Sequence, residues 1–216
     1  MSIKYCDGHK DCERQRFQRR FCAALVAFIL LLLLIVLIVW LVLRPTKPRF
    51  YLNDVSIVCI NVTSSSSSYL TVTMQATMAA RNPNARVGIY YDRADVFAEY
   101  RGLQITVPTS LPAAYQGHLD ASVWSPFLSA VDVPLPPYLA EALAQDETAG
   151  YLLVTVRLVA SIRWKAGAFI TSHYNLRVRC PALLTVNDGQ GSYGSNSGGG
   201  QGYFKFQRAA SCVVDV

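Results

Sequence analysis

The pattern of hydrophobic positions first singles out one long apolar run, from Ala23 to Leu43, which contains no charged residue, glycine or proline. At ~1.5 Å per residue a helix of this length spans roughly 31 Å, the thickness of one bilayer hydrocarbon core. A cleaved signal peptide has an apolar region about half as long, followed by a small-residue cleavage site. Here the run ends WLVLRPTKPR instead. The pattern therefore predicts an uncleaved transmembrane signal anchor over 23–43.

Beyond residue 50 the hydrophobic period shortens to two, which is the period of a half-buried β-strand. Apolar and polar side chains alternate most regularly over 69–80, 152–164 and 170–180. Less regular alternation predicts further strands at 50–62, 86–91, 94–107, 115–124 and within the closing YFKFQRAASCVVDV. Polar turns separate the strands at 64–68, 82–84 and 166–167. At Asn82-Pro83-Asn84 we expect a turn in which proline fixes φ and asparagine tolerates left-handed backbone.

One helix is predicted from Pro137 to Gln145, because proline suits a first helical turn and Leu139, Ala142 and Leu143 form one apolar face. The Gly/Ser-rich stretch 187–202 lacks side chains for a core, and we expect a mobile loop there. Short antiparallel strands with a single helix predict a mainly β fold: an immunoglobulin/fibronectin-like β-sandwich of about seven strands with one helix, preceded by the transmembrane helix.

Charges flanking the apolar run predict the orientation of the chain. Six Lys or Arg residues precede it, whereas only Arg44, Lys47 and Arg49 follow before Arg81. The positive-inside rule therefore places the N-terminus in the cytosol and everything after the span in the lumen or outside the cell. The predicted organisation is a cytosolic basic tail (1–22), a signal anchor (23–43), a proline-rich stalk (44–49) and an extracellular β-sandwich domain (50–216).

The formal net charge of +6 is spread over the whole chain. The tail has six basic and three acidic residues, and the rest has fourteen basic and eleven acidic residues. Because no basic surface is concentrated outside the tail, the sequence gives no support for nucleic-acid binding. The basic run beside the span suits attraction to anionic lipid headgroups, and it equally suits a role in fixing topology alone.

The six cysteines are divided by the predicted membrane. Cys22 abuts the span and is a candidate for S-acylation, the alternative being an unmodified thiol. Cys59, Cys180 and Cys212 lie on the oxidising side, where three cysteines allow one disulfide. One hypothesis pairs Cys180, on the inward face of its strand, with Cys212 near the C-terminus. That bond would close a loop of about 31 residues, contribute roughly 3 kcal/mol in the chain-entropy model, and leave Cys59 as a buried free thiol.

No residue pattern points to catalysis, a cofactor or a metal. The three histidines, His9, His118 and His173, have no ligand spacing, and no G-x-S-x-G motif occurs. A G-x-G-x-x-G match at 189–194 lies in low-complexity sequence with no helix after it, so we treat it as chance. Asn61-Val62-Thr63 is an N-glycosylation sequon on the predicted outer side, and we expect Asn61 to be glycosylated.

Several longer stretches resemble one protein family. RPTKPRFYL (44–52), RNPNARVGIYYDRADVFAEYRG (81–102), YQGH (115–118), WSPF (124–127), RWKAGAFITSHYNLRVRCP (163–181) and SCVVDV (211–216) are similar to the plant NHL family. These are harpin-induced and disease-resistance-like membrane proteins with a late-embryogenesis-abundant group-two-type domain. The resemblance implies a plasma-membrane protein linked to pathogen defence, the hypersensitive response and senescence, and it favours the Cys180–Cys212 pairing. Some relatives end in a GPI signal; AASCVVDV is too short and polar for one, so we expect the helix as sole anchor.

We therefore expect a non-enzymatic plasma-membrane protein that takes part in defence signalling through its outward domain, without naming its protein partners at the membrane or cell wall or its oligomeric state. Tyr90, Tyr91, Arg93 and Tyr100 are candidates for an interaction surface. The alternative for Tyr91 and its neighbours is that they pack inside a strand. Two other functions stay open: a lipid-binding or membrane-contact module with an apolar groove between sheets, and an abiotic-stress protective protein. The 52% hydrophobic composition argues against a disordered protectant.

Overall fold

The structure of the protein is a computed structural model that describes residues 9–43, 45–64, 68–186 and 204–216. The chain forms two compact units, Met1–Arg44 and Pro45–Val216. One long helix belongs to the first unit, and the strands of the described chain belong to the second. The Gly/Ser loop predicted at 187–202 lies outside the described residues.

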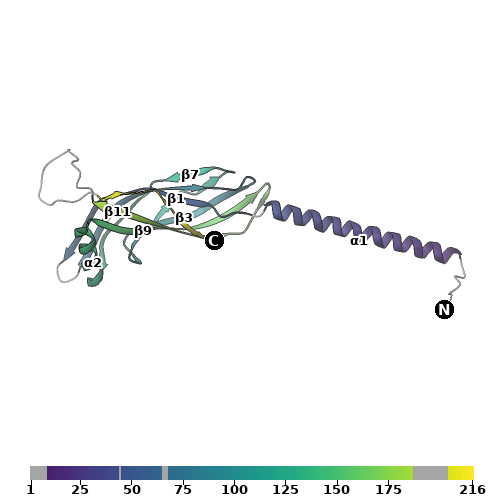
Figure 1. Cartoon of the computed structure of the whole chain (residues 1–216), viewed down its shortest axis with the longest axis horizontal. Coiled ribbons are helices and arrows are strands. Elements are labelled where there is room, and N and C mark those ends of the chain that lie inside the picture. The colour runs from purple at the N-terminus through teal and green to yellow at the C-terminus, as the bar shows by residue number, and fades with distance from the viewer. Residues whose placement is uncertain (1–8, 44, 65–67, 187–203) are drawn as a thin grey trace. The chain divides into compact units, whose positions relative to one another are not determined.

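The first unit contains helix α1 (His9–Leu43), which has 35 residues and is labelled in Figure 1. It begins before the predicted span because the polar residues ahead of Ala23 are mostly Arg, Gln, Glu and Lys, which are good helix formers. Its window Phe17–Ile38 is long and apolar enough to cross a membrane, and none of that window is buried. The helix is therefore compatible with a single membrane anchor.

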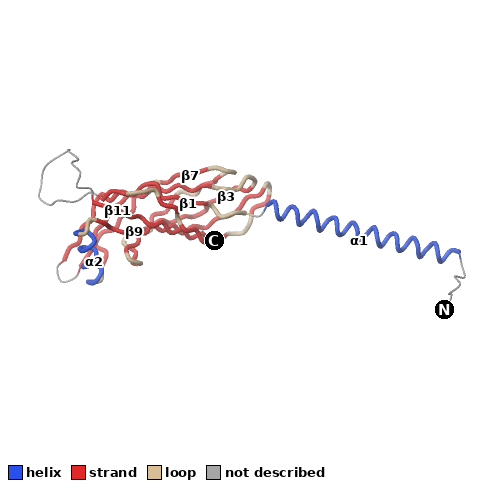
Figure 2. The backbone as a smooth tube through the Cα atoms, in the orientation of Figure 1, coloured by secondary structure: helices blue, strands red, loops and turns tan. Residues whose placement is uncertain are grey.

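The second unit is a sandwich-like arrangement of two layers of antiparallel strands, drawn as arrows in Figure 1 and as red tube in Figure 2. The first layer consists of β1 (Arg49–Ser64), β2 (Ser68–Arg81), β7 (Ala121–Trp124) and β8 (Phe127–Leu135). The second consists of β3 (Val87–Tyr100), β4 (Leu103–Gln104), β5 (Thr109–Leu111), β6 (Ala114–Gln116), β9 (Tyr151–Ala166), β10 (Phe169–Ile170), β11 (Tyr174–Val186) and β14 (Val213–Asp215). Strands β12 (Phe204–Phe206) and β13 (Ala210–Ser211) pair with β1, and β12 also pairs with β11, so hydrogen bonds continue from one layer into the other.

The mainly β class is confirmed, and the described part of the domain contains one helix, α2 (Pro137–Thr148), where it was predicted. The expected count of about seven strands is too low, because fourteen are present in the described chain. Many of the additional strands have only two to four residues. Such short pairings depend on a neighbouring strand, so hydrophobic alternation along one segment does not reveal them.

Several strand boundaries also differ from the prediction. The two strands expected at 86–91 and 94–107 begin as one continuous strand, β3, with a register shift between Tyr91 and Arg93. It ends at Tyr100, where Arg101 and Gly102 adopt φ of 48° and 86° and turn the chain into β4. The strand expected at 115–124 is divided into β6 and β7. Strand β8 was not predicted, since prolines flank it and Pro134 lies inside it.

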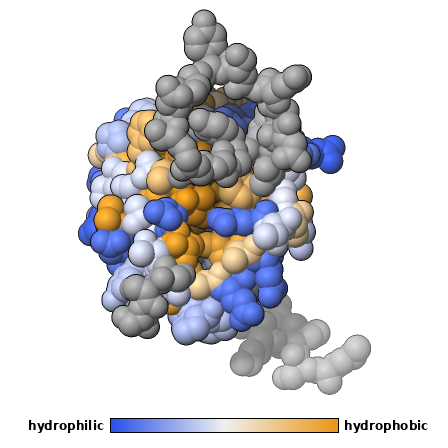
Figure 3. Space-filling view, turned by 90° about the vertical axis from the view of Figure 1, so that its left-hand side faces the viewer, coloured by the Kyte–Doolittle hydropathy of each residue, from blue (hydrophilic) through white to orange (hydrophobic). Residues whose placement is uncertain are grey.

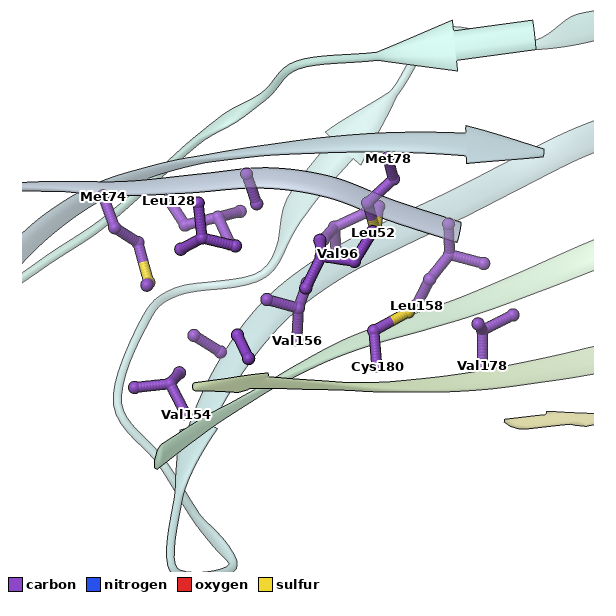
Figure 4. Packing of buried hydrophobic residues seen from close by; sticks show 14 of the residues in the cluster. Leu52, Met74, Met78, Val96, Leu128, Val154, Val156, Leu158, Val178 and Cys180 are labelled. Carbon is purple, nitrogen blue, oxygen red and sulfur yellow. The ribbon is translucent and has the colours of Figure 1, made fainter. Parts of the chain in front are cut away.

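The core lies between the two layers (Figure 4). Every second residue of β2 is buried, from Leu70 to Ala80, and β9 and β11 alternate in the same way. The side chains labelled in Figure 4 come from both layers: Leu52, Met74, Met78 and Leu128 from the first, and Val96, Val154, Val156, Leu158, Val178 and Cys180 from the second. Burying one such large apolar side chain stabilises the fold by about 1.5–3 kcal/mol.

A buried pair of asparagines shapes the turn at 82–84 and holds the beginning of the domain. Asn82 Nδ2 donates to the carbonyls of Val87 and Gly117, each at 2.8 Å. Asn84 exchanges two hydrogen bonds of 2.8 Å with the backbone N–H and C=O of Thr46. Neither asparagine has positive φ, so the expected left-handed geometry is wrong. The two asparagines instead serve through their side-chain hydrogen bonds. Those of Asn84 connect Thr46, in the predicted stalk, to the domain.

Candidate functional site

An aromatic and cationic cluster lies on the outward face of β3, β6 and β9. The rings of Tyr90 and Tyr115 are 4.6 Å apart between centroids, and Lys165 Nζ lies 5.7 and 5.3 Å from their centroids. Arg163 lies 5.6 Å from the centroid of Tyr90. Gly88 gives Tyr115 room, because a Cβ there would overlap the Tyr115 hydroxyl and ring. Tyr115 is 45% exposed, so the cluster presents amphipathic side chains to solvent.

An ion pair lies next to this cluster. Arg163 donates from Nε and Nη2 to the two carboxylate oxygens of Asp92 at 2.7 and 2.5 Å. His173 Nε2 is 3.4 Å from the same carboxylate. The hydrogen bonds from Arg163 hold the pKa of Asp92 below its ordinary value of 3.8. Asp92 is therefore a structural partner of Arg163.

Two of the four predicted surface residues are buried. Tyr91 is 3% exposed, contacts Phe50 and Trp124 edge-on, and donates from its hydroxyl to Gln116 Oε1 at 3.1 Å. Burial raises the pKa of the Tyr91 phenol. Tyr100 is 1% exposed. Neither residue belongs to an interaction surface, because each faces the core.

Tyr100 fastens β3 to α2 through a carboxylate. Its hydroxyl donates to Asp146 Oδ2 at 2.7 Å, and Arg101 Nη2 donates to both oxygens of Asp146 at 3.0 and 3.1 Å. Burial first, and then the hydrogen bond to Asp146, raise the pKa of Tyr100 to about 12. Asp146 itself is buried, so Arg101 supplies the positive charge that balances it.

Arg93 and Tyr90 are the predicted residues that do reach the surface. The Arg93 side chain is 77% exposed and its Nε lies 2.9 Å from Asp95 Oδ2, while Ser110 donates to the other oxygen of Asp95 at 2.6 Å. The sequence analysis missed Tyr115 and Lys165 as neighbours of Tyr90. Lys165 could have been placed beside Arg163 from the sequence. It lies two positions after Arg163, so it continues the polar face of the strand predicted at 152–164.

A pocket of about 550 Å³ lies at the α2 end of the domain. Figure 3 views this end and shows apolar surface exposed between hydrophilic residues. Residues along one side of α2, the end of β1 and the start of β2 line the pocket: Ile60, Asn61, Val62, Ser68, Pro137, Ala140, Glu141, Ala144 and Glu147. Burial raises the pKa of Glu147. The side chain of the sequon residue Asn61 is exposed here, which leaves it accessible for modification.

The structure contains a disulfide between Cys180 and Cys212, the predicted pairing, with the two Cα atoms 4.4 Å apart. It connects the buried face of β11 to the C-terminal segment. Cys59 is a free thiol, but it is half-buried rather than buried as expected, because it follows a register shift in β1 between Ile57 and Cys59. Cys22 is a free and exposed thiol on α1, as S-acylation would require.

In the part of the chain that the structure describes, no group of three or more His, Cys, Asp or Glu side chains is placed to hold a metal ion. His173 contacts Asp92, and His118 is exposed. The side chains of the cluster on β3, β6 and β9 make aromatic, cation–π and ion-pair contacts.

The fold and the sequence together define a class of protein: a late-embryogenesis-abundant type β domain carried behind one apolar helix. The family model described as "Late embryogenesis abundant protein" matches residues 77–180. NDR1/HIN1-like protein 1 of Arabidopsis thaliana is 39% identical over 99% of this chain and 100% of its own length. NDR1/HIN1-like protein 12 of the same plant is 40% identical over 87% of this chain and 89% of its own.

The chain belongs to the NDR1/HIN1-like, or NHL, family of plant proteins, as the sequence resemblance indicated. NDR1/HIN1-like protein 26 of Arabidopsis thaliana is a further relative, 36% identical over 68% of each chain. A crystal structure of a protein from Archaeoglobus fulgidus aligns with 63% of this chain and 98% of its own, with a TM-score of 0.31 and 13% identity. That similarity is too distant to support any conclusion.

Proposed function

We propose that this protein is a single-pass plasma-membrane protein that takes part in plant defence signalling by binding other proteins through its outward β domain. In this proposal residues 1–22 are the cytosolic tail, 23–43 span the membrane, 44–49 are the stalk and 50–216 are the extracellular domain. The observation that carries the proposal is the full-length relationship to NDR1/HIN1-like protein 1, because it includes the apolar helix as well as the domain.

Two structural features support this topology. The 22-residue apolar window of α1 has no buried part, so in water its side chains would be exposed at a large hydrophobic cost. The disulfide between Cys180 and Cys212 is typical of domains that face an oxidising compartment. The basic tail then lies on the opposite, cytosolic side.

The binding surface in this proposal is the cluster of Tyr90, Tyr115 and Lys165, with Arg93 further along β3. Tyrosine and arginine are enriched where protein interfaces are tightly packed. Here the two tyrosine rings are already in contact in the free protein, with their planes 40° apart, so little side-chain entropy would be lost when a partner binds. No catalytic role is included in the proposal.

Topology and partners are tested with the full chain in plant tissue. A protease added to sealed, right-side-out plasma-membrane vesicles should digest the C-terminal domain and leave the N-terminal tail intact, and carbonate washing should not release the protein. Proximity labelling from the C-terminus in infected tissue should recover defence-related surface proteins. The Tyr90→Ala/Tyr115→Ala variant should lose most of these partners, whereas Tyr138→Ala, at a 70% exposed tyrosine on α2, should retain them.

Protection of the C-terminal domain in such vesicles would contradict the topology. If wild type and the Tyr90/Tyr115 variant recovered the same set of bulk membrane proteins, the binding surface would be wrong while the topology stood. These two failures are separable, because the first concerns the anchor and the second concerns the outer face of β3.

A second candidate function, lipid binding, is favoured by the pocket beside α2. Its volume of about 550 Å³ falls within the roughly 300–1,000 Å³ typical of small-molecule sites. Apolar groups from Ile60, Val62 and Ala140 line it together with Glu141 and Glu147. Mass spectrometry of protein purified from plant membranes tests this idea: a lipid retained by wild type and lost in Ala140→Trp would support it, and equal retention would exclude it.

A further inference from the structure

Three turns lie side by side at one end of the second layer. Strand β6 ends at Gln116, β3 begins at Val87 and β9 ends at Ala166, and the three are neighbours through the pairs Ile89–Gln116 and Val87–Ala166. The order β6–β3–β9–β10 spans three strand spacings, or roughly 14 Å. The turns at 117–120, 83–86 and 167–168 therefore form one edge of the domain, at the opposite end of β9 from α2.

Large apolar side chains project from this edge. Phe169 is 80% exposed and Ile170 is 50% exposed. Leu119 is 58% exposed and has a φ of 55°. A leucine costs free energy in that left-handed conformation, where glycine or asparagine would be tolerated more easily. Leu119 therefore contributes neither to the core nor to a relaxed backbone at this turn. We look for the role of its apolar side chain at the surface.

Basic and amphipathic side chains accompany these residues. Lys165 lies opposite Ile170 in the β9–β10 pair and contacts the exposed ring of Tyr115. Arg86 is exposed in the turn that precedes β3. Asp120 is the acidic residue of the 117–120 turn, and its carboxylate accepts from the backbone N–H of Ala121 at 2.8 Å. Basic side chains beside exposed aliphatic and phenyl groups suit a membrane–water interface, because their long stems can lie along apolar surface while the charge stays in water.

The chain enters the domain at this same end. The backbone of Thr46 is bonded to Asn84, and the N–H of Leu119 donates to the carbonyl of Asn84 at 3.1 Å. Only Arg44 and Pro45 separate Thr46 from Leu43, the last residue of α1. Three residues reach at most about 11 Å, so the covalent link between Leu43 and Thr46 is short.

We propose that this edge of the domain rests in the headgroup region of the membrane leaflet in which α1 is anchored, with Phe169 and Leu119 inserted and Arg86 beside lipid phosphates. The proposal rests on the anchoring role of α1 in the proposed function. Lipid is the occupant that these observations favour, because at most about 11 Å of chain separates Thr46, which is bonded to Asn84 at this edge, from the end of the apolar helix. Two separated apolar tips also suit a fluid interface better than a shaped protein pocket.

The test uses the full chain, purified in detergent and assembled into phosphatidylcholine/phosphatidylglycerol nanodiscs. Cys6, Cys12, Cys22 and Cys59 are replaced by serine, and one environment-sensitive thiol probe is attached at Phe169→Cys. Val131→Cys is the matched control, since Val131 is 73% exposed on β8. Val131 is far from the proposed membrane edge. Its neighbour Ala130 pairs with Val72 of β2. Val72 is nine residues, or roughly 30 Å, from Arg81, the end of β2 that lies nearest that edge.

We expect spin-labelled lipids to quench the probe at position 169 by about twofold or more, with a blue-shifted emission, and to leave the probe at 131 unchanged. Equal emission at the two positions, whether both quenched or both unquenched, would overturn the proposal. Failure of the protein to enter the discs would instead contradict anchoring by α1, and with it both proposals. Entry into the discs with no quenching at 169 would overturn the headgroup contact alone.

Discussion

The hydroxyl of Tyr100 and the carboxylate of Asp146 form a 2.7 Å hydrogen bond between the last residue of β3 and the last turn of α2. Both side chains are buried, so the bond is made where water competes little for either group. Arg101 closes the arrangement from the solvent side. Together with Arg101, this pair makes the side-chain hydrogen bonds that join α2 to the second layer in the described part of the domain.

Replacing Tyr100 by phenylalanine should therefore destabilise the domain. Hydrogen bonds to charged groups contribute about 1.5–3 kcal/mol, and the variant would also leave Asp146 with one partner fewer. Urea unfolding of the purified protein should show this loss in the free energy of unfolding. Tyr138→Phe, at an exposed position on α2, is the control and should change stability by no more than about 0.5 kcal/mol. Equal stability of Tyr100→Phe and wild type would show that the bond has no net effect.

The ion pair between Asp92 and Arg163 predicts an acid-dependent part of the stability. Because Arg163 lowers the pKa of Asp92 below 3.8, the folded state binds this proton less readily than the unfolded state does. The pair therefore stabilises the fold at pH values above the unfolded pKa, and that contribution is lost as the pH falls through the folded pKa. Denaturant midpoints measured from about pH 6 down to about pH 2 should fall less steeply for Asp92→Asn than for wild type. Parallel curves would contradict this assignment.

The disulfide between Cys180 and Cys212 should be a large single contribution to stability. It links residues 32 positions apart, for which the chain-entropy model gives about 3–4 kcal/mol. The Cys180→Ala/Cys212→Ala variant should lose stability of that order in chemical denaturation, and adding a reductant should then have no further effect. Cys59→Ser is the control, because that thiol is free. Labelling of Cys180 by an alkylating reagent in unreduced protein would show that the bond is absent.

Occupancy of the sequon at Asn61 remains a prediction. Asn61 is exposed near the end of β1, so an oligosaccharide there meets no steric obstacle from the core. Protein from the secretory pathway should migrate faster after endoglycosidase treatment, and Asn61→Gln and Thr63→Ala should migrate like the treated protein. Thr63→Ser preserves the sequon and should migrate like untreated wild type. An unchanged mobility after treatment would rule the modification out.

The long strands were predictable because their burial alternates strictly, as it does in β2 and β9. Strand β8 was hidden by Pro126 and Pro134, which normally interrupt strands. Pro134 is tolerated because, among the described strands, β8 pairs with β2 alone, and an edge strand does not need every N–H for pairing. The bulge between Tyr91 and Arg93 was also invisible, since it changes register only relative to β9.

The site was less predictable than the fold, for a related reason. Val96, Ala98 and Tyr100 alternate on the buried face of β3, and this period alone indicates that Tyr100 is internal. The tyrosine cluster could not be derived in the same way, because Tyr90, Tyr115 and Lys165 come from three strands whose order depends on tertiary pairing. Sequence periodicity assigns a residue to a face, but it does not say which residues of other strands share that face.

The hydrogen bonds between Asn84 and Thr46 have a mechanical consequence. A force that pulls on the chain at Pro45 would act on these two hydrogen bonds before it acted on β1. After Thr46 the chain enters β1, which pairs antiparallel with β2 from the pair Arg49 and Arg81 to the pair Ser64 and Ser68. A force along the axis of β1 would therefore have to break many of these backbone hydrogen bonds together. The domain would thus resist being unfolded by a pull from its N-terminal end.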